Sequence, residues 1–365
     1  MNTIKDEKND NMLNKILNIS FNQDNSCFAI SNQTGFIIYE TFPFKKRKEK
    51  NLGGSIKITE MYYRSNILAL VSGGDFPKFD QKKLIIWDDS LNKVISDMNF
   101  YDGIKNIKMK RDKIYIINDI NLFVFNLKTM ENIEIISILE NSKGLFSINS
   151  DEKNDVIAYL GELNEKEINN NIYINIKNYN DSSDVKINLK DEMISFISLN
   201  NHGNLLAIAN DKGNEIKIFS CIKGELLAEF FRGKEKAEIN CICFDNLNNF
   251  IAVSSDRGTI HIWSLKKTLH KLTELKKDYL NSKDNSDENK INNIDELPEN
   301  KKLIFSKNEK SFAKIRLKSP KSIISFMENN IIVVVTTEGI YYQAQLDTKN
   351  GGTCKIIEQK DINSK

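Results

Sequence analysis

The chain has 365 residues, and its 52 lysines and arginines nearly balance its 50 aspartates and glutamates, giving a net charge of +2. This balance excludes the bulk positive field that non-specific nucleic-acid binding uses, so an anionic partner must be held by local patches. No window reaches the run of about 18 apolar residues that a membrane-spanning helix needs, so we expect only peripheral membrane contact. The five cysteines are scattered without a C-x-x-C pair, which indicates reduced core residues of a cytosolic protein.

Residues 1–15 are charged, lack the apolar segment of a signal peptide, and are expected to form a flexible leader. Short apolar runs then recur along the chain with turn residues between them and little helical periodicity. Many short strands without intervening helices favour an all-β fold, and so many in one chain favour a β-propeller over a single sandwich. Examples are ILNISF at 16–21, CFAISN at 27–32, KLIIWDD at 83–89 and LLAIAN at 205–210.

The stretch 226–265 carries the clearest pattern, because three runs within it alternate apolar and polar residues as half-buried strands do. Asp256, Arg257 and Gly258 join the last two runs as a tight hairpin, and the closing position of such a loop needs a positive φ that Gly reaches without a clash. Alternation also predicts that Ile260 and Ile262 point into the core.

Polar side chains of this stretch form the candidate ligand site. Thr259 and His261 share one face of their strand, and Arg232 supplies a planar guanidinium that can hold a phosphate through two parallel hydrogen bonds. Arginine, hydroxyl and imidazole groups together suit a phosphorylated ligand. The candidate residues are Arg232, Gly233, Ser254, Ser255, Thr259 and His261.

These residues have an alternative interpretation as ordinary structural groups. Propeller blades often use Ser, Thr and His to tie their own strands together through buried hydrogen bonds. Arg232 can likewise form a plain surface ion pair with Glu229 or Glu235.

The two motifs resemble those of the PROPPINs, WD-repeat-like β-propellers of autophagy that bind phosphoinositides. The family's Phe/Leu-Arg-Arg-Gly motif corresponds to Phe230-Phe231-Arg232-Gly233, in which Phe231 replaces the first arginine. Its Ser-Ser-Asp-x-Gly-Thr-x-His-Ile motif is intact at 254–262. The resemblance covers nearly the whole chain and is closest to the compact branch. It implies one seven-bladed β-propeller at 16–358, followed by a flexible tail at 359–365.

The family resemblance also implies a second lipid pocket on the preceding blade, and this pocket departs from the family pattern at several positions. The hairpin 206–217 offers amides and a lysine where hydroxyls and an arginine are expected, and Lys190 replaces a common histidine. We therefore expect a degraded pocket with loose affinity at most, and one intact pocket per chain. The residues of the degraded pocket are Phe231, Lys190, Asn210, Asn214 and Lys217.

A long insertion at 264–306 interrupts the strand pattern. Its first part, 265–280, has leucines at three- and four-residue steps among lysines, which is typical of a basic amphipathic helix, and 281–300 is expected to be disordered. By resemblance, this is where the family's membrane-inserting loop lies; a short helix packed on the propeller is the alternative. The predicted membrane-contact residues are Leu269, Leu272, Tyr279, Lys266 and Lys267.

Asn22 and Asp24 match an Asn-x-Asp with which related proteins of this branch dock an autophagy lipid-transfer protein. A plain Asx turn between two strands is the alternative. The basic runs 44–50 and 105–113 are candidate nucleic-acid or membrane patches, although such runs are more often solvated faces.

Taken together, the resemblance predicts a non-enzymatic effector that binds phosphatidylinositol 3-phosphate, with the 3,5-bisphosphate as a second candidate, through the variant Phe-Phe-Arg-Gly motif. It would recruit autophagy-related proteins to membranes, reside in the cytoplasm, attach peripherally to phosphoinositide-bearing organelle or autophagic membranes, and be a monomer in solution. No cofactor, metal or nucleic-acid partner is expected. The rival prediction is a protein-interaction scaffold that has lost most lipid binding.

Overall fold

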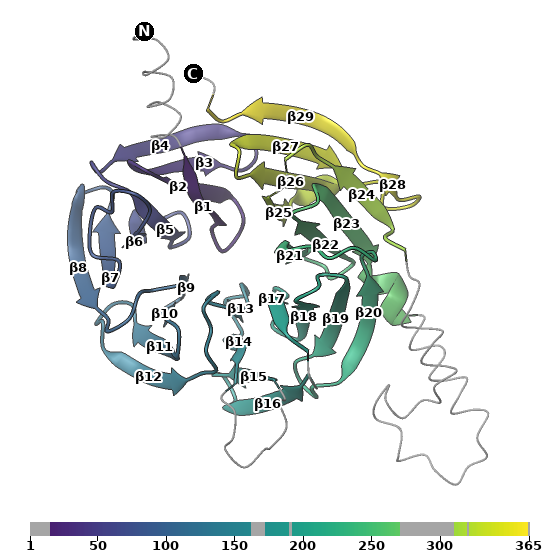
Figure 1. Cartoon of the computed structure of the whole chain (residues 1–365), viewed down its shortest axis with the longest axis horizontal. Coiled ribbons are helices and arrows are strands. Elements are labelled where there is room, and N and C mark those ends of the chain that lie inside the picture. Colours follow the sequence, from purple (N-terminus) through teal and green to yellow (C-terminus); the bar gives the residue numbers. More distant parts are fainter. Residues whose placement is uncertain (1–14, 162–171, 190–191, 271–309, 320, 364–365) are drawn as a thin grey trace. The chain divides into compact units, whose positions relative to one another are not determined.

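The computed structural model describes residues 15–161, 172–189, 192–270, 310–319 and 321–363. These residues form a seven-bladed β-propeller, as predicted, in which successive strands pair antiparallel within each blade (Figure 1). The chain divides into two compact units, one made of Met1–Gly144, Val333–Gln343 and Glu358–Lys365 and the other of Leu145–Ile332 and Ala344–Ile357.

Three sheets belong to the first unit. They contain, in order, β1 (Ile16–Phe21), β2 (Cys27–Asn32), β3 (Gly35–Glu40) and β4 (Lys45–Asn51); β5 (Ile56–Met61), β6 (Ile67–Ser72), β7 (Lys83–Asp88) and β8 (Lys93–Asn99); and β9 (Asn106–Lys110), β10 (Lys113–Ile117), β11 (Asn121–Asn126) and β12 (Asn132–Ser137).

Three further sheets belong to the second unit. They contain β13 (Phe146–Ile148), β14 (Val156–Leu160), β15 (Tyr173–Asn178) and β16 (Ser183–Asn188); β17 (Ile194–Leu199), β18 (Leu205–Asn210), β19 (Glu215–Ser220) and β20 (Leu226–Phe231); and β21 (Ile239–Phe244), β22 (Phe250–Ser255), β23 (Thr259–Ser264), β24 (Ala313–Arg316) and β28 (Gly352–Thr353). The seventh sheet contains β25 (Ser322–Phe326), β26 (Ile331–Thr336), β27 (Ile340–Gln345) and β29 (Lys355–Asp361).

The burial of each strand explains its sequence pattern. β18 and β26 lie inside their sheets and are buried at five or six of six positions, which is why they read as continuous apolar runs. β4, β8 and β12 are edge strands with mostly exposed side chains. β4 is almost entirely charged, whereas β8 and β12 mix polar residues with exposed apolar ones such as Ile95 and Ile133.

The edge strands share a local irregularity. In β4, β8, β12 and β20 the pairing register skips one residue, which leaves an extra residue in the edge strand, as in a β-bulge. The extra residues are Arg47, Ile95, Ile133 and Leu227.

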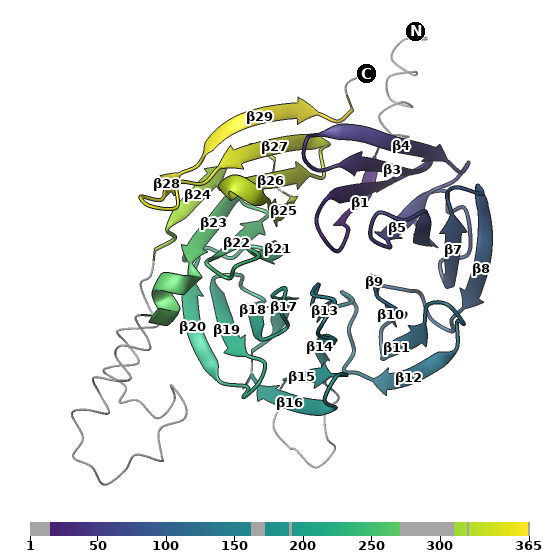
Figure 2. The ribbon, with the colours of Figure 1, turned by 180° about the vertical axis from the view of Figure 1, so that it is seen from behind.

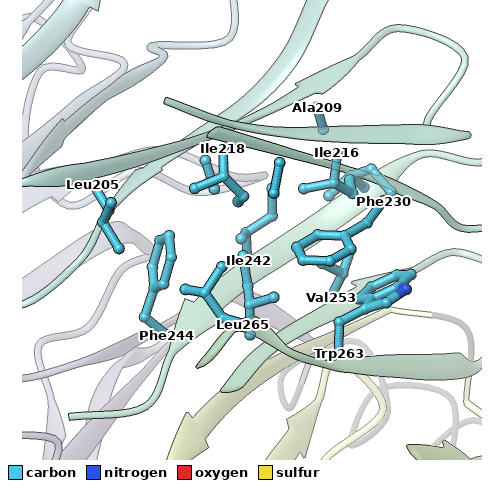
Figure 3. Packing of buried hydrophobic residues seen from close by; sticks show 14 residues of the cluster. Leu205, Ala209, Ile216, Ile218, Phe230, Ile242, Phe244, Val253, Trp263 and Leu265 are labelled. Atoms are coloured by element: carbon cyan, nitrogen blue, oxygen red, sulfur yellow. The ribbon is translucent and has the colours of Figure 1, made fainter. Parts of the chain in front are cut away.

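The core next to the candidate site is an apolar cluster shared by the sheets β17–β20 and β21–β24. Phe230 stacks on Trp263 with ring centroids 5.3 Å apart, and Ile242 and Val253 belong to the same cluster (Figure 3). Burial of such large side chains contributes roughly 1.5–3 kcal/mol each, so this cluster fixes the position of the strands that carry the site.

The C-terminal segment differs from the prediction of a flexible tail. β29 continues to Asp361, the Ile362 N–H donates to the Gly339 carbonyl at 2.7 Å, and the Asn363 side chain donates to the Glu338 carbonyl at 3.1 Å. The tail is therefore ordered as far as Asn363, because a strand that pairs in a sheet is fixed by its backbone hydrogen bonds. The predicted leader up to residue 14 and the predicted disorder at 281–300 lie outside the described residues.

The insertion begins directly after β23. Residues 265–270 are helical and lie beside β20, as seen from both sides in Figures 1 and 2. The chain returns at β24, which pairs antiparallel with β23, so the insertion separates two neighbouring strands of one blade.

Candidate functional site

The hairpin between β22 and β23 forms as the sequence predicted. Gly258 has φ +70°, and a Cβ added there would lie 2.8 Å from the Leu317 carbonyl oxygen, so this position requires glycine. The Gly258 carbonyl accepts a 2.8 Å hydrogen bond from the Leu317 N–H, which ties the hairpin to the segment after β24. Ile260 and Ile262 are buried, which confirms the predicted alternation of β23.

Arg232 follows β20 and is held by a neighbouring loop. Its Nε donates to the Gly213 carbonyl at 2.6 Å, and its Nη2 donates to the Glu235 carbonyl. Gly213 has φ +62°, and a Cβ there would come within 2.0 Å of the Ala237 carbonyl oxygen, so glycine is what lets the two loops approach. Within the described part of the chain these bonds use Nε and Nη2, which leaves Nη1 for a ligand. Arg232 bonds the backbone of Glu235 rather than its carboxylate.

A second guanidinium lies close to that of Arg232. Arg257, in the hairpin loop, donates from Nε and Nη2 to the Lys236 carbonyl at 3.2 and 2.8 Å. Burial lowers the pKa of Arg232, and the positive charge of Arg257 lowers it further, whereas Asp256 and Glu235 act in the opposite direction. The site therefore contains cations that repel one another.

His261 lies deeper, with 8% of its surface exposed. Its ring stacks on Trp263 at 5.6 Å, and its Nδ1 lies 3.3 Å from the Ser311 hydroxyl. Burial, followed by the charges of Lys314 and Arg232, lowers the pKa of His261 to about 4. The imidazole is consequently neutral at pH 7 and offers one N–H donor.

These contacts identify two cations that sequence reasoning missed. Lys314 is the partner of His261 across the β23–β24 ladder, although more than fifty positions separate them in the chain. Arg257 lies within the recognised motif, at its variable position. Lys314 and Arg232 place positive charge beside His261, and Arg257 adds charge beside Arg232, which favours an anionic ligand with several acceptor oxygens.

The two predicted serines are buried next to this site. Ser254 is fully buried and donates to the Ser322 carbonyl at 2.7 Å, and Ser255 is buried and its hydroxyl accepts from the Arg257 N–H at 3.4 Å. Ser254 follows the alternative interpretation, in which blade hydroxyls satisfy the protein's own backbone. Ser255 lies two residues after Val253, the strand partner of His261, and therefore shares the face of His261. Thr259 is half-buried at the start of β23, opposite Arg316, and Gly233 has open space where a Cβ would lie.

The predicted degraded pocket is occupied by internal interactions. The Asn210 side chain donates to the Asn214 side chain at 2.8 Å. Lys217 forms an ion pair with Glu192 and lies 3.8 Å from Glu229, so two carboxylates already balance its charge.

The two remaining residues of the predicted degraded pocket are Phe231 and Lys190. Phe231 is half-buried at the end of β20, and it faces away from its fully buried neighbour Phe230. Lys190 lies outside the described residues.

The start of the insertion packs onto the protein. Leu265 is fully buried in the cluster around Trp263, and Leu269 is partly buried against the same cluster. Leu269 therefore agrees with the alternative prediction, in which the helix packs on the propeller. Lys266 and Lys267 are exposed, and the Lys267 ammonium lies 4.7 Å from the Phe312 ring centroid. Leu272 and Tyr279 lie outside the described residues.

Asn22 and Asp24 occupy a turn in the first unit. The Asn22 side chain is 3% exposed, accepts from the Cys27 N–H at 3.0 Å and donates to the Tyr63 carbonyl at 3.2 Å. Asp24 is exposed and accepts from the Ser26 N–H and hydroxyl at 3.0 and 2.6 Å. Asn22 thus has the geometry of the predicted alternative, a structural turn.

Among the described residues, no group of three or more His, Cys, Asp or Glu side chains is placed to hold a metal ion. The same part of the chain contains no helix with the length and apolarity needed to cross a membrane.

Sequence and structure comparisons relate this chain to known proteins. Residues 16–362 match the model of the PROPPIN family. Autophagy-related protein 18e of Arabidopsis thaliana is 28% identical over 354 residues, which cover 95% of this chain and 87% of the plant protein. The crystal structure of Kluyveromyces marxianus Hsv2 superposes with a TM-score of 0.72 at 18% identity, covering 96% of this chain and 99% of Hsv2. KlAtg21, in its complex with the coiled-coil of AgAtg16, superposes with a TM-score of 0.72 at 21% identity, covering 95% and 99%.

Proposed function

Because this chain belongs to the PROPPIN family, we propose that it binds phosphatidylinositol 3-phosphate on the sheet β21–β24 and recruits autophagy proteins to membranes that carry this lipid. One observation supports the proposal: the charges of Lys314 and Arg232 lower the pKa of His261, and the charge of Arg257 lowers the pKa of Arg232. A phosphate placed among them removes this repulsion and accepts charge-assisted hydrogen bonds.

We assign the contacts as follows. The Nη1 edge of Arg232 and the neutral imidazole of His261 donate to the 3-phosphate, and Thr259 adds a hydroxyl at the rim. Arg257 and Lys314 contribute charge, and a 5-phosphate, if present, would add to the same attraction. Ser254 takes no part, because its hydroxyl is committed to the Ser322 carbonyl.

We further propose one lipid per chain. In the preceding sheet, Lys217 already has Glu192 and Glu229 as counter-ions, so binding a phosphate there would require breaking two ion pairs. A single headgroup contact gives weak, reversible membrane binding, and a second signal is needed for stable attachment. The basic insertion, with Lys266 and Lys267 exposed at its start, supplies that signal in this proposal.

The partner class follows from the relatives. KlAtg21 forms a complex with the coiled-coil of AgAtg16, and we propose that this chain likewise engages autophagy proteins from the cytoplasm while attached peripherally to the membrane.

Flotation with vesicles tests the proposal. Wild-type protein is expected to float with phosphatidylcholine vesicles that contain phosphatidylinositol 3-phosphate and to stay behind with vesicles that contain unphosphorylated phosphatidylinositol. Arg232→Ala is expected to lose flotation, whereas Arg64→Ala, which removes an exposed arginine from the other unit, is expected to keep it. Equal flotation of wild type and a folded Arg232→Ala protein would reject the site.

A second candidate function is a protein-interaction scaffold without lipid binding. The observation that favours it is that Arg232 already donates to two backbone carbonyls, as a purely structural arginine would. Failure of the wild-type protein to float with any 3-phosphorylated lipid, together with a marked loss of thermal stability in Arg232→Ala, would favour the scaffold.

A further inference from the structure

The strand that carries Lys314 enters its sheet in an unusual way. In five other sheets, the last strand is joined to the one before it by a turn of four or five residues, such as 89–92 between β7 and β8. β24 instead follows β23 only after the insertion, so no short turn fixes its position. The entropic cost of closing a loop rises with loop length, and a four-residue strand offers few hydrogen bonds in return. β24 is therefore the outer strand that gains most from a second partner.

That partner comes from the connection between β27 and β29. This connection, residues 346–354, contains β28, which pairs parallel with β24 (Figure 1). The Phe312 carbonyl accepts from the Gly352 N–H at 2.9 Å, and the Lys314 carbonyl accepts from the Cys354 N–H at 2.9 Å. We call residues 346–354 the strap. The strap and β24 both belong to the second unit.

Protection of an exposed sheet edge does not explain the strap. Sheet edges can pair with other chains, and proteins often cover them. The outer strands β4, β8, β12, β16, β20 and β29 are also sheet edges, and no fifth strand covers any of them in the described part of the chain. The strap therefore serves a need that is specific to the sheet β21–β24.

Two neighbouring glycines fit the strap to β24. Gly351 has φ +69°, a left-handed conformation that other residues rarely adopt, and a Cβ at this position would lie 2.2 Å from the Phe312 carbonyl oxygen. Glycine is what permits this approach. Gly352 has φ +88°, but a Cβ there would meet open space. The two glycines thus share a strained backbone and differ in the contact with Phe312, which makes them a matched pair for substitution.

The strap is ordered by its own turn. The Asp347 carboxylate accepts hydrogen bonds from the N–H groups of Lys349 and Asn350 at 2.9 and 3.0 Å, and from the Asn350 side chain at 3.0 Å. The Gly351 N–H donates to the Asp347 carbonyl at 2.9 Å. The hydrogen bonds from Asn350 and Lys349 lower the pKa of Asp347, so its carboxylate stays ionised and keeps these bonds at neutral pH.

The residues under the strap contact both the lipid site and the insertion. The Ser311 hydroxyl lies 3.3 Å from Nδ1 of His261, and Lys314 lies opposite His261 in the β23–β24 ladder. The Lys267 ammonium, at the start of the insertion, lies 4.7 Å from the ring centroid of Phe312, where the chain returns from it. A displacement of Phe312 would therefore move Ser311 and Lys314 relative to His261.

We propose that the strap is a positioning element of the lipid site. The close approach of Gly351 fixes Phe312, and the pairing of β28 with β24 holds Lys314 beside His261. This inference rests on the proposed function, because it assigns a role to residues around the same phosphate. The strap residues do not contact the ligand and act through β24. A binding site keeps its geometry only if the strand that carries it is itself fixed.

Calorimetry with the soluble headgroup inositol 1,3-bisphosphate tests the proposal, because a soluble ligand removes membrane contact of the insertion from the measurement. Gly351→Ala is expected to lower headgroup affinity by about tenfold, since Lys314 and His261 shift relative to Arg232 and charge-assisted contacts are lost. Gly352→Ala has comparable backbone strain without the clash, and it is expected to lower affinity by less than about twofold.

Gly35→Ala controls for loss of stability. A Cβ at Gly35 would lie 2.1 Å from the Lys50 carbonyl oxygen, which is a clash of the same kind in the first unit. This variant is expected to lose thermal stability, as Gly351→Ala does, and to keep its headgroup affinity. If Gly351→Ala does not fold, Asp347→Ala takes its place. Its control is Asp181→Ala, because Asp181 accepts from the Ser183 N–H in the turn between β15 and β16, outside the sheet that carries the site.

The imidazole of His261 provides a second measurement that needs no ligand. Its pKa of about 4 reflects burial and the charges of Lys314 and Arg232. NMR titration of the ring in Gly351→Ala is expected to give a pKa closer to the ordinary value of about 6.5, because the ring becomes more exposed and Lys314 moves away. Gly35→Ala is expected to keep the wild-type pKa of His261.

Two outcomes would overturn the role of the strap. The first is that folded Gly351→Ala binds the headgroup as wild type does. The second is that Gly351→Ala and Gly35→Ala lose affinity equally, which would show a general effect of lower stability. Failure of the wild-type protein to bind the headgroup would instead reject the proposed function. In that case the pKa of His261 in Gly351→Ala decides whether the strap positions Lys314, and an unchanged pKa would show that it does not.

Discussion

The sheets β17–β20 and β21–β24 share one architecture but present opposite electrostatic environments at the same position. Lys217 is the third residue of β19, and His261 is the third residue of β23. Lys217 is balanced by Glu192 and Glu229, whereas His261 lies in the positive field of Lys314 and Arg232. A cationic residue in a blade therefore does not by itself make an anion site. The charges on the neighbouring strands decide whether a phosphate would relieve repulsion or break an ion pair.

The pH dependence of stability tests the environment of His261 and has the largest expected effect. The pKa of His261 is about 4 in the folded protein, below its ordinary value of 6.5. The unfolded chain binds this proton first, so the contribution of neutral His261 is present above about pH 6.5 and is lost as pH falls toward 4. The difference between the unfolded and folded pKa values of His261 corresponds to about 3 kcal/mol of free energy of unfolding.

Chemical denaturation at several pH values, with His261→Gln as the comparison, measures this contribution. The loss of stability between pH 6.5 and 4 is expected to be smaller in His261→Gln than in wild type. Identical pH profiles for the two proteins would show that His261 is not held neutral by its surroundings. His202→Gln is a suitable control, because His202 is exposed and paired with Asp151.

Loss of the guanidinium at position 232 tests the anion site itself. Arg232→Ala is expected to lower affinity for the soluble headgroup inositol 1,3-bisphosphate by about tenfold to a hundredfold, because a hydrogen bond to a charged group contributes roughly 1.5–3 kcal/mol. Calorimetry measures both affinity and stoichiometry, and one headgroup per chain is expected. Two equivalent sites would contradict the argument built on Lys217.

Restoring an arginine in the preceding sheet is expected to have the smallest effect. Phe231→Arg alone should raise headgroup affinity by less than about threefold, because Lys217 remains balanced by its carboxylates. Combining it with Glu192→Gln and Glu229→Gln should produce a second, weak site in calorimetry. A strong second site in Phe231→Arg alone would show that the missing arginine, and not the neighbouring acids, silences this sheet.

Several elements could be predicted from the sequence because they depend on interactions between residues close together in the chain. The alternation in β23 predicted that Ile260 and Ile262 are buried, and Asp256 to Gly258 predicted the hairpin through the conformational freedom of Gly258. The tail at 359–365 was predicted to be flexible although residues 359–361 belong to β29, since the pairing of an edge strand depends on a distant neighbour rather than on its own composition.

Side-chain direction was less accessible from sequence. Ser254 belongs to the recognised motif, yet its hydroxyl is committed to the Ser322 carbonyl. Asn22 is likewise committed to its own turn, with its side chain bonded to the backbones of Cys27 and Tyr63. A motif specifies residue types, and a hydroxyl or amide of the right type satisfies the nearest backbone group when one lies within reach.

The sequence by itself determined that this protein is an all-β propeller with the PROPPIN motifs, because strand alternation, turn glycines and motif spacing are properties of consecutive residues. Only the tertiary structure decided which charges meet. Lys314 joins His261 through strand pairing across the insertion, and Arg257, which donates to the Lys236 carbonyl, comes close to Arg232 through loop packing. Electrostatic interaction depends on distance in space, and that distance is set by strand register and loop packing rather than by position along the chain.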